Sequence, residues 1–162
     1  MASLNTSIAE YTRQLRNGDI QKAYKGIMAF MSALKSDMEN KYPGYAAGAF
    51  YFGYMDMTYF AFTPLELKKK NLKIAVVYLH EENRFEAWLG GGNRKVRDEY
   101  IERLKRRDIG DLRLSGAGAG VDSIVERELV SRPDFDHTDA LMQTVESRTI
   151  QFAESILSIL NE

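Results

Sequence analysis

A glutamate and a tryptophan in a mostly apolar run are the first candidates for chemistry. Glu86 and Trp88 are two positions apart in Phe85–Leu89, so in an extended strand both side chains would point to one face. Asp56 and Thr58 would join them if neighbouring hairpins pair. A carboxylate pair beside an aromatic wall could perform acid–base chemistry or hold a ligand. Strand alternation also predicts a plainer alternative, a solvent-facing sheet surface with Trp88 half covered by a helix.

A glycine-rich turn before a predicted helix is the second candidate. Gly90-Gly91-Gly92 is followed by Asn93, Arg94 and Lys95. Glycines let a ligand approach the backbone, and the N–H groups at a helix start favour an anion. We therefore expect Gly91, Gly92, Asn93 and Arg94 to bind a phosphate or carboxylate group. The spacing of a P-loop is absent, and a flexible strand-to-helix turn capped by Asn93 explains the same residues.

Histidine and cysteine usage excludes several kinds of site. The chain has no cysteine and two histidines, which excludes disulfides, thiolate metal sites and histidine-rich metal cages. His80 lies beside Glu81 and Glu82 at the end of a predicted hairpin, and we interpret it as a solvated turn residue. His137, near a predicted helix start, is equally ordinary. Carboxylates could hold Mg²⁺ or Ca²⁺, but no loop motif supports such a site, so we expect neither a metal nor another cofactor.

The charge distribution favours an anionic partner only mildly. Net charge is −1, although residues 63–113 carry 13 Lys or Arg against 9 Asp or Glu. Lys68–Lys70 and the basic residues of Arg103–Arg107 could form a phosphate-contacting surface. Solvated helix ends explain them equally well, because cations favour helix C-termini. Nucleic acid is therefore a weak alternative, and a small anionic ligand is the preferred partner.

The elements that must position these residues follow from periodicity. Strands are expected near 46–54, 57–62, 72–79 and 84–90. Helices are expected after Thr6 or Ser7, after Asp19, after Asn93 and from Asp136. Helices, then strands, then helices predict an α+β fold. In this fold a roughly four-stranded antiparallel sheet of two hairpins carries the N-terminal and C-terminal helices.

Three segments carry more detailed predictions. The apolar stripe of the second helix is expected in the core: Ile20, Tyr24, Ile27, Met28, Met31, Leu34 and Met38. Thr63-Pro64-Leu65-Glu66 has the form of a capping box and predicts one or two helical turns. Residues 108–121, which include a glycine- and alanine-rich run, are expected to be a mobile loop, and Asp122 is expected to cap a short helix to Val130.

Length and composition predict an ordinary globular protein. The chain has 162 residues and is 44% hydrophobic, which suits a single domain over 1–162. No apolar run reaches the roughly 18 residues that span a bilayer, and the first residues lack a signal-peptide pattern. We therefore expect a cytoplasmic location and no membrane partner.

Three motifs together resemble a family of uncharacterised bacterial proteins, a domain of unknown function that covers nearly the whole chain. The motifs are the strings Tyr51–Phe60, Phe85–Asn93 and Gly120–Glu126. The resemblance implies a single intracellular domain and brings no activity or substrate.

The leading hypothesis is a small ligand-binding or interaction domain, with Asp56, Glu86 and Trp88 beside the glycine turn. The alternative is a metal-assisted hydrolase or nucleic-acid-processing enzyme that uses Asp56, Glu86 and Glu126. A homo-oligomer formed through an uncovered aromatic sheet face is a third possibility, and whether the protein is an enzyme is left open.

Overall fold

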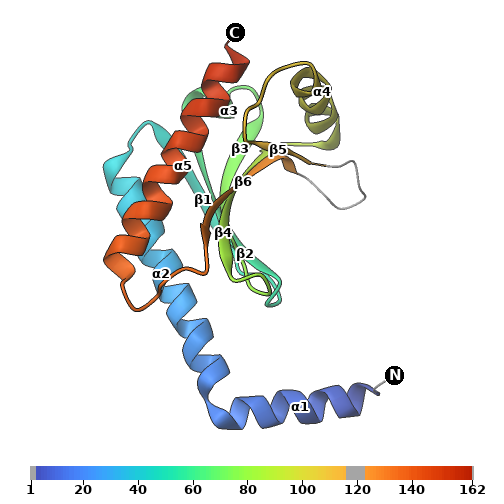
Figure 1. The fold of residues 1–162 in the computed structure, drawn as a ribbon, viewed down its shortest axis with the longest axis vertical. Helices are drawn as coiled ribbons and strands as arrows, with labels where there is room; N and C mark the ends of the chain where they lie inside the picture. Colours follow the sequence, from blue (N-terminus) through green and yellow to red (C-terminus); the bar gives the residue numbers. More distant parts are fainter. Residues whose placement is uncertain (1–2, 116–122, 162) are drawn as a thin grey trace.

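The protein folds into an antiparallel sheet with long helices on one side (Figure 1). The computed structural model describes residues 3–115 and 123–161. The helices are α1 (Leu4–Asn17), α2 (Asp19–Lys41), α3 (Leu65–Lys68), α4 (Arg94–Lys105) and α5 (Thr138–Leu160). The strands are β1 (Tyr45–Tyr51), β2 (Met57–Pro64), β3 (Leu72–Leu79), β4 (Arg84–Gly91), β5 (Arg113–Leu114) and β6 (Ser123–Ser131).

The sheet has six strands in the order β1-β2-β3-β4-β6-β5, and every neighbouring pair is antiparallel. The first four strands form the two predicted hairpins, which confirms the α+β class. The expected count of four strands was too low, because β5 and β6 extend the sheet beyond β4. The longest register joins β3 to β4 and places Ala75 opposite Trp88.

The two faces of the sheet differ in what covers them. Helices α2 and α5 lie on one face of the sheet (Figure 1). The completely buried side chains on that face include Phe60, Ile74, Val76 and Leu89. The α4 helix contacts β4, β5 and β6 and buries Tyr100, Ile101 and Leu104 in the same core. Among the described residues no helix covers the opposite face, where Tyr59, Lys73 and Trp88 keep contact with solvent.

Helix α2 is buried along only part of its length. Met31, Leu34 and Met38 lie in the core as predicted, together with Phe30. Ile20 near the start of the helix is 39% exposed, and Tyr24, Ile27 and Met28 are partly exposed. Helix α1, which begins at the N-cap Ser3, projects away from the sheet and buries no residue (Figure 1). The predicted core stripe is therefore correct for the second half of α2 and wrong for the first.

Tertiary contacts overturn two predictions, the helix after Asp122 and the Thr63 cap, although α3 confirms the helical turn expected after Pro64. Residues 123–131, expected as a helix capped by Asp122, form β6 and pair with β4. Thr63 does not cap a helix, because its hydroxyl accepts a hydrogen bond from the Ile74 backbone N–H at 3.1 Å. The Gly116–Gly120 run and Asp122 lie outside the described residues. No helix in the described residues is long and apolar enough to cross a membrane.

Candidate ligand-binding site

The open face of the sheet is hollowed beside Trp88. The hollow has a volume of about 430 Å³. Apolar and aromatic side chains line most of it, with Lys73, Ser123, Glu126 and the backbone of Gly90–Gly92 at its margins. The lining apolar residues are Met57, Tyr59, Ala75, Val77 and Trp88. The register creates the hollow, because Gly90 lies between Lys73 and Ser123 on neighbouring strands and has no side chain to fill the space.

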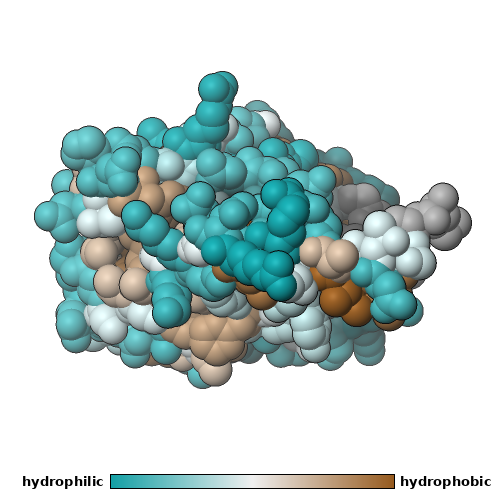
Figure 2. Space-filling model, turned by 90° about the horizontal axis from the view of Figure 1, so that it is seen from below, coloured by the Kyte–Doolittle hydropathy of each residue, from teal (hydrophilic) through white to brown (hydrophobic). Residues whose placement is uncertain are grey.

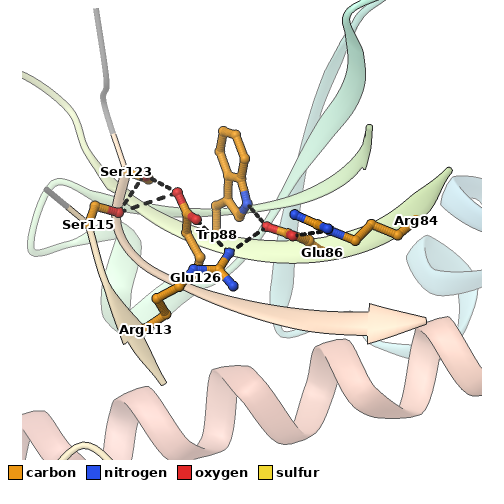
Figure 3. A network of polar contacts seen from close by, with 7 residues as sticks. All are labelled: Arg84, Glu86, Trp88, Arg113, Ser115, Ser123 and Glu126. Carbon is orange, nitrogen blue, oxygen red and sulfur yellow. Dashed lines mark hydrogen bonds and ion pairs between the residues drawn. The ribbon is translucent and has the colours of Figure 1, made fainter. Parts of the chain in front are cut away.

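A buried carboxylate lies next to Trp88 on the same strand face (Figure 3). The side chain of Glu86 is 1% exposed. One carboxylate oxygen accepts from Arg84 Nε at 2.6 Å, and the other accepts from Trp88 Nε1 at 2.8 Å and Arg113 Nη2 at 3.0 Å. A buried charge needs such partners, because desolvation without them is strongly unfavourable. The hydrogen bond to Glu86, on the same strand, therefore fixes the orientation of the Trp88 indole ring.

The network continues across β5 and β6. Arg113 Nη2 also donates to Glu126 Oε1 at 2.7 Å, and these carboxylate contacts raise the pKa of the Arg113 guanidinium, the Glu126 hydrogen bond most of all. Ser123 Oγ donates to Glu126 Oε2 at 2.7 Å, and Ser115 Oγ lies 3.3 Å from the same oxygen. Two carboxylates and two guanidinium groups therefore form one charge-balanced chain (Figure 3).

This arrangement is suited to holding side chains in place rather than to proton transfer. Both oxygens of Glu86, and both of Glu126, already accept from side-chain donors. Within the described residues no group of three or more histidine or carboxylate side chains is placed to hold a metal ion. The carboxylate cluster expected for a metal-assisted enzyme, with Asp56 beside Glu86 and Glu126, is therefore not found in this part of the chain.

The glycine turn is filled by the protein's own atoms. A Cβ on Gly91 would lie 2.7 Å from the Arg97 backbone nitrogen, and one on Gly92 would lie 2.1 Å from Asn71 Oδ1. Asn93 caps α4 as predicted, with its side-chain oxygen accepting from Val96 N–H at 2.9 Å. These glycines thus permit close packing of β4, α4 and the turn before β3. Gly91 and Gly92 line the Trp88 hollow, whereas Asn93 and Arg94 do not.

The expected neighbours of Glu86 from the first hairpin lie elsewhere. Asp56 accepts from the Tyr54 backbone N–H at 2.8 Å, and this bond, with a second from Met57 N–H, lowers the pKa of the Asp56 carboxyl. Thr58 is buried on the helix-covered face, opposite Tyr78, so it cannot face Trp88. Asp56 therefore shapes the β1–β2 turn, and the expectation that Thr58 shares the Trp88 face was wrong.

Sequence reasoning missed three residues that shape the site. Arg84 is two positions before Glu86, so strand alternation alone could have placed the two side chains on one face. Lys73 is opposite Gly90 in the predicted hairpin and could have been found from that register. Arg113 had no local signal, since it lies in a two-residue strand and reaches Glu86 across 27 positions of sequence.

Comparison with known proteins adds a family but no activity. The curated proteins and the solved structures contain no match to this chain. A family model does match residues 4–160. That span includes every helix and strand of the fold, from the first residue of α1 to the last residue of α5. The chain therefore belongs to DUF7000, a family defined as a domain of unknown function.

Proposed function

We propose that this chain is a binding module that holds a small anionic ligand with a flat apolar part on the open face of its sheet. The observation that carries this proposal is the hollow of about 430 Å³ lined by Trp88, Tyr59 and Lys73. Small-molecule sites are typically about 300–1,000 Å³, with mostly apolar walls and a few polar groups that fix orientation. The hollow has both properties.

The charge of the ligand is inferred from Lys73. Glu126, the other charged residue that lines the hollow, is neutralised by Arg113. Lys73 is exposed and has no ion pair with any residue in the described part of the chain. Lys73 is two residues before Ala75, the partner of Trp88, and on the same face of β3, so its ammonium can reach a group that stacks on the indole. A carboxylate or phosphate would complement it.

The rigidity of Trp88 supports binding over catalysis. Its indole N–H is held by Glu86, which is held in turn by Arg84 and Arg113. A fixed aromatic ring loses little entropy when a ligand stacks on it. The metal-assisted hydrolase and the nucleic-acid-processing enzyme would need a ligand-free carboxylate pair, and Glu86 and Glu126 do not supply one. We therefore keep binding as the proposed function.

The indole N–H signal of Trp88 can report binding directly, because the chain has a single tryptophan. The full-length ¹⁵N-labelled protein is titrated with 2-naphthoate, an aromatic carboxylate, and separately with uncharged 2-naphthol. We expect 2-naphthoate to shift the indole N–H signal in a saturable manner and 2-naphthol to shift it much less. Lys73→Gln should weaken 2-naphthoate binding about fivefold, which corresponds to an exposed ion pair of about 1 kcal/mol.

Lys69→Gln is the matched control, since Lys69 is exposed and does not line the hollow. It should bind 2-naphthoate as the wild type does. Equal binding by the two variants, or an indole signal that 2-naphthoate leaves in place, would contradict the proposal. Self-association, a cytoplasmic location and a bacterial source remain predictions from the sequence.

A further inference from the structure

A second hollow, at the other end of the sheet, lies beside the exposed half of α2. It has a volume of about 820 Å³ and is lined by α2, the ends of the hairpins and the segment before α5. Ile20, Tyr24 and Ile27 form its α2 wall, and Tyr78 and Phe135 add aromatic surface. These α2 residues belong to the predicted core stripe, but they are only partly covered by the rest of the described chain. Figure 2 views the molecule from this end and shows hydrophobic residues exposed between hydrophilic ones.

His80 is the chemically distinctive residue of this hollow. Its ring is half-buried, packs against Tyr24 at 6.1 Å between ring centroids and meets Tyr78 edge to face at 5.0 Å. Its Nε2 lies 2.8 Å from Thr58 Oγ1. His80 lies in a turn as predicted, but it is half-buried rather than fully solvated, because Thr58 and two aromatic rings hold it in place.

The hydrogen bonds around Thr58 fix which histidine nitrogen carries the proton. The Thr58 hydroxyl has one hydrogen, and it donates that hydrogen to the Phe52 carbonyl at 2.7 Å. Oγ1 can then only accept from His80, so Nε2 must be protonated. In the neutral ring Nδ1 consequently holds the lone pair. The structure selects one tautomer from the two available to a neutral histidine.

His80 lines the hollow, and its Nδ1 is free to accept a hydrogen bond. Nδ1 has no hydrogen-bond partner in the described part of the chain, and it is not among the buried unpartnered atoms found there. Burial lowers the pKa of His80 and outweighs the opposing charge of Asp56, so the acceptor form is favoured at neutral pH. The charged residues that line the hollow are Asp19, Lys22 and Asp136, and this balance disfavours an anionic ligand.

We infer that this hollow, here called the His80 pocket, binds a small uncharged aromatic molecule that donates a hydroxyl or amine hydrogen bond to His80 Nδ1. Tyr24, Tyr78 and Phe135 supply the aromatic surface. A ligand with a hydrogen-bond donor should bind more tightly than an analogue without one, because the analogue would bury His80 Nδ1 without a hydrogen-bond partner. The inference is independent of the proposed function, which concerns the opposite sheet face and an anionic ligand.

The first measurement is the tautomer of His80 by long-range ¹H–¹⁵N correlation on the full-length protein. The chain has only two histidines, and His137 serves as an internal reference because it is exposed and pairs with Asp134. We expect His80 to be neutral and protonated at Nε2 at neutral pH. Protonation at Nδ1 instead would overturn the inference, whatever ligand is added.

The second measurement is binding of 2-naphthol, with naphthalene as the analogue that lacks the donor. Titration with 2-naphthol should shift the Nδ1 signal of His80 and leave His137 unchanged, and naphthalene should bind at least fivefold more weakly. Tyr24→Ala should weaken 2-naphthol binding by a similar factor. Tyr11→Ala, an exposed tyrosine outside the pocket, is the matched control. Equal binding of the two compounds, or equal effects of the two variants, would refute the inference, and 2-naphthoate shifts at Trp88 would be unaffected by either result.

Discussion

Replacing Glu86 by glutamine tests the network beneath Trp88. Glutamine has the same shape but presents one oxygen and one NH₂ group in place of two acceptor oxygens. Whichever way the amide turns, its N–H groups face either Arg84 Nε or the Trp88 and Arg113 donors. One side of the network must therefore lose its hydrogen bonds and place donor against donor.

The size of the effect follows from burial. A hydrogen bond between charged groups contributes about 1.5–3 kcal/mol, and breaking a fully buried ion pair costs about 3–5 kcal/mol. Arg84 and Arg113 are 33% and 53% exposed, so water compensates part of the loss. We expect Glu86→Gln to lower the free energy of unfolding by about 2–3 kcal/mol. For a chain of this size that is a decrease in Tm of about 4–12 °C.

Urea unfolding followed by far-UV circular dichroism measures this difference. Glu128→Gln is the matched control, because Glu128 is opposite Glu86 on β6 but is exposed, and it should change stability by less than about 0.5 kcal/mol. The Trp88 emission should also change in Glu86→Gln, since the indole loses its acceptor. Equal stabilities of the two variants would show that the Glu86 network does not stabilise the fold.

Three further predictions concern His80, Gly91 and Gly26. Because the pKa of His80 is lowered in the folded state, the unfolded chain binds more protons between that pKa and about 6.5, so His80 makes stability fall as pH decreases through this window. His80→Gln should remove this part of the pH dependence in urea titrations, and an unchanged slope would contradict it. Gly91→Ala should destabilise the protein by about 1–3 kcal/mol, because its Cβ would lie 2.7 Å from the Arg97 backbone nitrogen. Gly26→Ala, in open space within α2, should stabilise it by about 0.5–1 kcal/mol in the same assay, and a loss of stability there would count against this reasoning.

Local patterns were sufficient where an element's own residues fix its structure. The alternation of β3 and β4 and the cap at Asn93 were predictable, because period, turn and capping residue lie within a few positions of each other. The same patterns placed Glu86 and Trp88 on one strand face. They failed at β6, where Glu126, Arg127 and Glu128 favour a helix in isolation. Pairing with β4, together with ion pairs to Arg113 and Asp111, makes this segment a strand.

The sequence by itself determined the α+β class, the two hairpins and the core half of α2, because apolar periodicity follows the geometry of each element. Only the tertiary structure decided which polar groups meet. Arg113 reaches Glu86 across 27 positions, and His80 reaches Thr58 across 22. Such contacts depend on the register between strands and on the position of each helix relative to the sheet. A short stretch of residues determines neither of them. For that reason the Trp88 hollow and the His80 pocket emerge only from the folded chain.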